Sequence, residues 1–196
     1  MATRTRAARL DPEERRGQLI ELGLRMLSSD APDRVPVDEI AEAAGISRGL
    51  LFHYFPTKRD FYVAVAGEAA KKLLAVTEPD PQLHHMERLH ASLGAYVDFV
   101  AGNEALYIAL VKGASGSDKE LQAISEATRA EVAERVIESL SLADPSPALR
   151  IAVWGWVGFI EEATLDWLRN RDLDRDRLLS IMERVLVYAL ETAAVA

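Results

Sequence analysis

The chain has 196 residues, enough for one domain with a real core and a small appendage. Apolar residues make up 49% and charged residues 28%, a mixture that excludes disordered and fibrous classes. Cysteine is absent, which excludes disulfides, thiol catalysis and thiolate metal sites. With no signal-peptide pattern and no long uncharged run, we expect a cytoplasmic protein with no membrane partner. The net charge of -8, taken alone, argues against DNA as a partner.

The charge is unevenly distributed along the chain. Residues 1–60 hold 10 Lys/Arg and 10 Asp/Glu, whereas residues 61–196 hold 13 and 21, so the whole acidic excess lies in the C-terminal two-thirds. The first ten residues contain three arginines and no acid. This asymmetry indicates two parts with different partners, and it leaves the N-terminal part free to bind an acidic polymer.

Periodicity and capping signals predict helices throughout the chain. A first helix is expected from Pro12, after the cap Asp11, to about Ser28, and a proline-containing break follows it. The other expected helices cover about residues 37–44, 48–55, 58–76, 83–102, 104–112, 118–140, 148–169 and 176–194. The sequence therefore predicts an all-α fold of about nine helices.

Residues 37–61 carry the most informative pattern. Gly45 allows a sharp turn, and Ser47 can cap the helix that follows it. Before the turn, four apolar residues share one helix face: Val37, Ile40, Ala41 and Ala44. This arrangement is typical of a helix-turn-helix, whose second helix points its first residues at base edges in the major groove.

The same segment resembles the DNA-binding domain of the TetR family of bacterial transcriptional repressors. The residues that carry the resemblance are Ala44-Gly45-Ile46-Ser47, Phe52-His53-Tyr54-Phe55 and Lys58. It is close over about the first 75 residues. Beyond residue 80 it is one of length and helix order, with residues 154–168 similar to the family's penultimate helix. It implies a three-helix DNA-binding domain at residues 1–57, with a basic arm at 1–10, and a helical effector-binding and dimerisation domain at 58–196.

The resemblance also implies roles for single residues. Arg48 and Gly49 would lie over base edges, Tyr54 would donate to a phosphate, and Lys58 would meet an anion at a helix N-terminus. Ser47 would cap and touch the backbone of the DNA. The chain departs from residues that the family often has at three positions: Pro36, Leu50 and Phe52. Leu50 and Phe52 could contact a thymine methyl group instead. The arginines of the arm, Arg4, Arg6 and Arg9, either reach the minor groove or belong to an unstructured terminus.

The acidic C-terminal part is rich in aromatic residues at helical spacing, which fits either core packing or a ligand pocket. The resemblance implies a hydrophobic small-molecule effector in this part. The candidate contact residues, taken from the aromatic spacing and the nearby polar groups, are Tyr96, Phe99, Tyr107, Trp154, Phe159 and Glu162, with Glu161 as a further polar candidate. Two glycines, Gly155 and Gly158, leave a flat strip on a helix that is apolar nearly all round. Together with Leu179, Met182 and Leu186 they are expected to form a homodimer interface, unless these faces pack within one chain.

Other chemistries are set aside. The spacing of His84, His85, Glu87 and His90 does not suit a metal, and the acidic run at residues 172–176 reads as helix capping rather than a calcium loop. Phosphate-loop, dinucleotide and nucleophile motifs are missing, so we expect no cofactor and no enzyme activity. The leading hypothesis is a homodimeric, ligand-responsive repressor that binds a palindromic operator in double-stranded DNA. The alternative is a helical small-molecule-binding protein that has lost DNA binding.

Overall fold

A computed structural model describes residues 11–28, 35–114, 118–140 and 144–195. All secondary structure in these ranges is helical, which confirms the predicted all-α class. The nine helices there are α1 Pro12–Leu27, α2 Val37–Ala43, α3 Arg48–Tyr54, α4 Lys58–Val76, α5 His85–Gly102, α6 Glu104–Ala114, α7 Lys119–Ser139, α8 Pro147–Asn170 and α9 Arg175–Val195. Each end lies within two residues of the predicted one. The basic arm lies outside the described residues.

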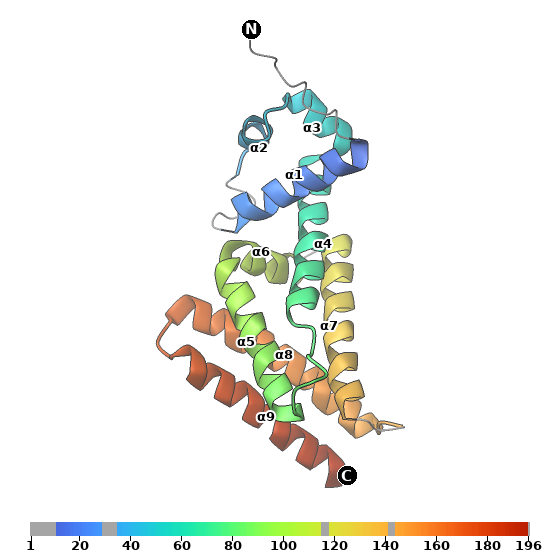
Figure 1. The fold of residues 1–196 in the computed structure, drawn as a ribbon, viewed down its shortest axis with the longest axis vertical. Helices are drawn as coiled ribbons and strands as arrows, with labels where there is room; N and C mark the ends of the chain where they lie inside the picture. The colour runs from blue at the N-terminus through green and yellow to red at the C-terminus, as the bar shows by residue number, and fades with distance from the viewer. Residues whose placement is uncertain (1–10, 29–34, 115–117, 141–143, 196) are drawn as a thin grey trace.

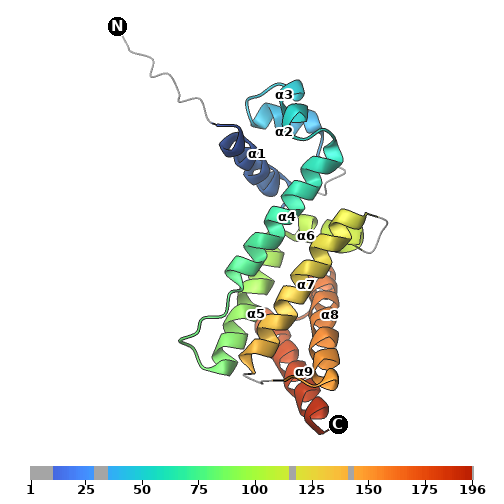
Figure 2. The ribbon, with the colours of Figure 1, turned by 90° about the vertical axis from the view of Figure 1, so that its right-hand side faces the viewer.

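The molecule is elongated, with two groups of helices joined by α4 (Figure 1). Helices α1, α2 and α3 lie at one end, and α5, α8 and α9 lie at the other. Helices α4 and α7 run side by side in both views and pack against each other (Figure 2). Helix α4 therefore connects the two ends directly.

The local chemistry of the helix starts explains the accuracy of the predicted boundaries. Asp11 accepts from the backbone N–H of Glu14 at 2.8 Å, and the Glu14 carboxylate accepts from the Asp11 N–H at 3.0 Å. Thr57 and Asp60 make the same reciprocal pair at the start of α4, at 3.1 and 2.9 Å. These capping boxes satisfy backbone donors that the first helical turn leaves free, so they fix where each helix begins.

Two apolar cores stabilise the fold, and α4 contributes to both. Phe61 and Val65 are buried in the N-terminal core, and Leu73 packs against the C-terminal core. Close approach of α1 to α4 requires Gly23, because a Cβ there would lie 2.5 Å from a ring carbon of Phe61. The domain boundary predicted at residue 57 stays a prediction, since one continuous helix spans the two cores from residue 58.

Polar contacts also tie the two ends together. Arg59 of α4 donates to both carboxylate oxygens of Asp118, the N-cap of α7, at 2.8 and 2.6 Å. At the opposite side, the Ser28 hydroxyl donates to the side-chain oxygen of Asn103 at 2.8 Å, next to α6. These contacts connect the starts of α6 and α7 with α1 and α4.

Candidate functional site

The predicted helix-turn-helix is formed by α2, a tight turn and α3. Gly45 adopts a positive φ of 65°, the left-handed region that favours glycine, and it lets the chain reverse between the two helices. Ile40 and Ala41 of α2 and Leu51 of α3 are buried in the N-terminal core. With these residues inside, the first turn of α3 projects away from the rest of the molecule (Figure 1).

Arg48, Gly49 and Leu50 begin α3 and are exposed, Leu50 by 38%. The Arg48 guanidinium donates to both carboxylate oxygens of Asp38 at 3.2 and 3.0 Å, and it lies 5.5 Å from the ring centre of Phe52. Asp38 was not predicted as a site residue, because an acid in the first turn of a helix reads as favourable to the helix dipole. This ion pair is exposed and lies at the start of α3.

The remaining predicted DNA contacts flank α3. The Ser47 hydroxyl accepts from the backbone N–H of Leu50 at 3.2 Å, so it caps α3. Tyr54 is half-buried against the N-terminal core, with its ring edge-on to His53 at 5.5 Å. Lys58 is the first residue of α4, and its ammonium lies 5.2 Å from the ring centre of Tyr62. The structure thus places all seven predicted residues on α3 or directly beside its ends.

A large cavity lies between α4, α5, α6, α7, α8 and α9, with a volume of about 400 Å³. Tyr96, Phe99 and Tyr107 line it, as their predicted role requires. Trp154, Phe159 and Glu162 do not, and for these three the predicted placement was wrong. Trp154 is 43% exposed, Glu162 is exposed, and Phe159 is half-buried against the C-terminal core.

The side of α8 that faces the cavity carries Trp156 and Glu161 instead. Trp156 is 3% exposed, and its indole N–H donates to the carbonyl oxygen of Met182 at 2.8 Å. Residues two apart in a helix point about 200° away from each other, so Trp154 and Trp156 cannot both face inward. Because α8 is apolar nearly all round, its sequence does not indicate which tryptophan is the inner one.

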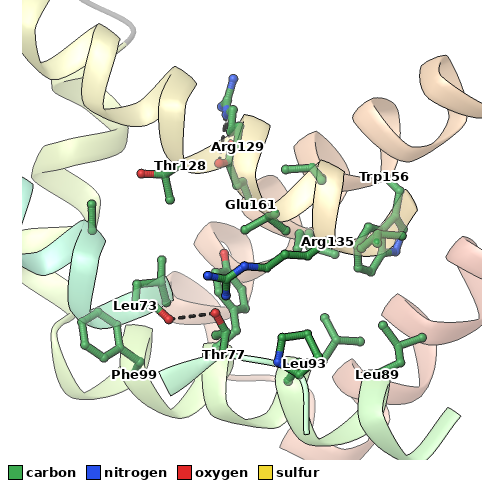
Figure 3. Close-up of a pocket in the computed structure, with 18 of the residues that line it drawn as sticks. Leu73, Thr77, Leu89, Leu93, Phe99, Thr128, Arg129, Arg135, Trp156 and Glu161 are labelled. Atoms are coloured by element: carbon green, nitrogen blue, oxygen red, sulfur yellow. Dashed lines mark hydrogen bonds and ion pairs between the residues drawn. The ribbon is translucent and has the colours of Figure 1, made fainter. Parts of the chain in front are cut away.

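Paired polar groups lie in the half of the cavity nearer the helix-turn-helix. The hydroxyls of Tyr96 and Tyr107 are 2.6 Å apart, and burial raises the pKa of Tyr96 to about 12 and also raises the pKa of Tyr107. Arg129 and Glu161 form a two-armed ion pair, with one contact at 2.9 Å (Figure 3). The hydrogen bonds that Arg129 donates to the Glu161 carboxylate raise the pKa of Arg129. Within each pair the polar groups are each other's partners, so this half of the cavity wall carries no net charge.

Two further arginines line the other half of the cavity. Arg135 donates to the carbonyl oxygen of Leu74 at 2.7 Å and to Glu131 at 2.9 Å. Arg88 donates through one terminal nitrogen to two carbonyls of the α4–α5 linker, at 3.1 and 3.0 Å. Its Nε is buried and has no hydrogen-bond partner within the described ranges. These arginines were not predicted, because an arginine on an amphipathic helix reads as part of its solvated face.

The predicted dimer residues on α9 are also corrected. Leu179, Met182 and Leu186 are at most 4% exposed within the single chain, because α9 turns this face onto α5 and α8. On the outside of α8, by contrast, Gly155 and Gly158 have open space where a Cβ would be. Large apolar side chains are exposed on these two helices: Ile151 by 74% and Trp154 by 43% on α8, and Tyr188 by 72% on α9.

Within the described residues, His, Asp and Glu side chains do not gather in groups of three or more that could hold a metal ion. No described helix has both the length and the apolar character to cross a membrane.

Comparison with known proteins decides the family. Residues 19–65 match the family model for bacterial regulatory proteins of the tetR family, and residues 85–189 match the model for the tetracyclin repressor-like C-terminal domain. The chain belongs to the TetR family of transcriptional regulators. A TetR-family protein is a DNA-binding regulator with a ligand-binding C-terminal domain, and the family is not an enzyme family.

Three individual proteins illustrate what the chain is similar to. A tetR-family regulator from Streptomyces coelicolor has a TM-score of 0.89 and 31% identity, over 95% of this chain and 84% of that one. The transcriptional activator FasR of Mycolicibacterium smegmatis is 26% identical over 177 residues, which cover 87% of this chain and 80% of FasR. FadR of Bacillus subtilis, solved with stearoyl-CoA, shares the fold with a TM-score of 0.63 at 18% identity, over 89% and 97% of the two chains.

Proposed function

We propose that this TetR-family regulator binds a palindromic operator as a homodimer and releases it when a hydrophobic small molecule fills the cavity. One observation carries the proposal: Ala69 and Leu106 belong to the N-terminal core and also line the cavity. A ligand in the cavity therefore touches residues that share one apolar core with α1 and the helix-turn-helix. Such a regulator works in the cytoplasm, where it meets both its operator and its effector.

The exposed start of α3 supports DNA reading. Arg48 suits the two acceptors of a guanine in the major groove, because a guanidinium can donate to both at once. Tyr54 and Lys58 are proposed to contact phosphates, which set the register of the protein without reading sequence.

The outer face of α8 supports a two-fold dimer. Ile151, Trp154, Gly155 and Gly158 recur at i, i+3, i+4 and i+7, so they share one face, and the glycines allow a second helix to approach closely. Two recognition helices are needed to read half-sites about 34–36 Å apart. We therefore assign the subunit contact to this face and to Tyr188 of α9, in place of the buried α9 residues.

Release follows if the ligand-filled cavity favours a different position of α4. The N-terminal end of α4 lies at the helix-turn-helix, and three residues farther along it line the cavity: Ala69, Ala70 and Leu73. A shift of this helix changes the separation of the two recognition helices in a dimer, so only one arrangement matches both half-sites. FasR is named as an activator. The proposal for this chain is repression, which a reporter gene behind the operator reads directly.

A second candidate is a small-molecule-binding protein with lost DNA binding. Pro36 at the N-cap of α2 makes no side-chain cap hydrogen bond, and Arg48 is already paired with Asp38. The same experiment separates the two candidates. Fluorescence anisotropy would measure binding to the DNA upstream of the protein's own gene at several salt concentrations.

The variants define the expected result. Arg48→Ala is expected to relax sequence preference, with a loss of about 1–3 kcal/mol at one base position. Lys58→Ala is expected to weaken binding to all sequences alike and to reduce the salt slope by about one. Binding that prefers no palindrome at low salt would favour the second candidate and overturn the proposal.

A further inference from the structure

We infer that the cavity takes a single unbranched acyl chain whose anionic head group binds Arg88. The inference deepens the proposed function and rests on it for its regulatory meaning. Three observations carry it: the shape of the cavity, the pairing of its polar groups, and the unmet donor of Arg88.

The cavity is elongated. Residues of α5 and its C-cap line it from His85 to Asn103, and residues of α7 and its C-cap line it from Leu121 to Leu140. Such stretches of helix extend about 27 Å, at about 1.5 Å per residue. The cavity therefore follows most of the length of these two helices and forms an elongated channel. A flexible linear chain fills a channel, whereas a compact ring system leaves most of it empty.

The wall of the channel suits a hydrocarbon chain along most of its length. Its middle is formed by apolar side chains that include Leu93, Val132, Val136, Trp156, Val157 and Ile160. Figure 3 shows Leu89, Leu93, Trp156 and Phe99 around this space. Each methylene moved from water into such a wall improves affinity about fourfold. Affinity should therefore depend steeply on chain length.

Of the three arginines that line the channel, only Arg88 has no carboxylate partner in the described part of the chain. Arg129 is neutralised by Glu161, and Arg135 is held by Glu131 and a backbone carbonyl. Arg88 has no carboxylate within ion-pair distance in the described part of the chain, and its buried Nε donates to nothing there. A buried N–H donor without an acceptor is costly, and an anionic oxygen beside the half-buried guanidinium would supply both the acceptor and the opposite charge.

Arg88 also lies at the correct end of the channel for a head group. It follows the α4–α5 linker, where the neighbouring lining residues His85 and Met86 are exposed, Met86 by 46%. A head group there reaches solvent while the chain runs inward toward Tyr96 and Tyr107. Fatty acids and acyl thioesters of coenzyme A share this chemistry, one through a carboxylate and the other through phosphates.

The test measures ligand binding to the full chain without DNA, by calorimetry. Octanoate, laurate, palmitate, palmitoyl-CoA and the uncharged hexadecan-1-ol serve as probes. We expect affinity to rise about fourfold per methylene until the channel is full, and palmitate to bind at least tenfold more tightly than hexadecan-1-ol. Tighter binding of palmitoyl-CoA than of palmitate would assign the thioester as the source, and the reverse order would assign the free acid.

Variants test the position of the head group and of the chain. Arg88→Gln should lower the affinity for palmitate at least tenfold and leave the affinity for hexadecan-1-ol unchanged. Arg88→Lys should keep part of the palmitate affinity that Arg88→Gln loses. Arg150→Gln, a surface control, should change the affinity for neither ligand. Val132→Trp blocks the channel midway and should shift the preference toward octanoate, with melting curves confirming that it folds.

Three outcomes overturn the inference: affinity independent of chain length, equal loss of palmitate and hexadecan-1-ol in Arg88→Gln, or tighter binding of a rigid polycyclic compound. Because DNA is absent from the assay, these outcomes leave the proposed operator binding intact. Conversely, a protein that binds acyl chains but no operator retains this inference and loses the proposed function.

Discussion

Replacing Ile151 by alanine should weaken the proposed dimer several hundredfold without affecting the fold of the protomer. The substitution removes three carbons, worth about 0.8 kcal/mol each when fully buried. The side chain is 74% exposed in the single chain, so a partner could bury about three-quarters of it, about 1.8 kcal/mol per protomer. A two-fold interface contains the residue twice, which gives about 3.5 kcal/mol, or about 300-fold in the dissociation constant.

Sedimentation velocity over a range of protein concentrations measures that constant. Val76→Ala is the matched control, because Val76 is 50% exposed but lies at the end of α4, away from α8 and α9. Neither variant should change the melting temperature of the protomer, since both side chains face solvent. An Ile151→Ala protein that dimerises as tightly as the parent would refute the assignment of the interface to this face of α8.

Three further predictions concern the cavity, the link between the two ends, and the N-terminal core. Ultraviolet titration should show Tyr96 ionising near pH 12, because burial raises its pKa and that of Tyr107. Stability should fall as pH rises from 10 through 12, because the unfolded chain releases these protons first. Titration of all five tyrosines near pH 10 would contradict the burial. The hydrogen bond from Arg59 lowers the pKa of Asp118, so the stabilisation by this carboxylate is present above the ordinary carboxyl pKa and is lost as pH falls through the lowered value. Asp118→Asn should remove that acid dependence of the melting temperature and blunt the effector response. The control Glu120→Gln should do so far less. Gly23→Ala should lower the free energy of unfolding in urea by about 1–3 kcal/mol, because the added methyl group overlaps with α4. The control Gly17→Ala should not, because a Cβ at Gly17 meets no atom within 4 Å. Equal stability of the two variants would contradict the tight packing of α1 against α4.

The sequence predicts the helices and the helix-turn-helix well because their signals are local. Asp11 and Thr57 begin capping boxes, and Gly45 has the backbone freedom that a tight turn needs. These features involve residues within a few positions of each other. They are therefore readable without knowing how the helices pack.

The cavity and the dimer face depend on packing between distant helices, and the sequence predicts them less well. Glu161 and Glu162 are adjacent in the sequence, yet one is paired inside the cavity wall and the other is exposed. Leu179 and Met182 carry the apolar character expected of an interface, but a core needs the same character. Only the positions of α5 and α8 decide between the two roles.

The net charge of -8 is now compatible with DNA binding. The residues proposed to contact DNA lie on α3 and at the start of α4, at one end of an elongated molecule (Figure 1). The effector cavity occupies the opposite, acidic part. DNA affinity should therefore depend on a few placed contacts and on dimerisation rather than on overall charge.

The most direct test of the account measures operator affinity with and without a saturating amount of the tightest-binding amphiphile of the chain-length series. The account predicts at least a tenfold weaker dissociation constant for the operator in its presence. It also predicts that saturating operator weakens amphiphile binding by the same factor, because coupling between two sites is reciprocal. An operator affinity that stays unchanged while the cavity is filled would contradict it.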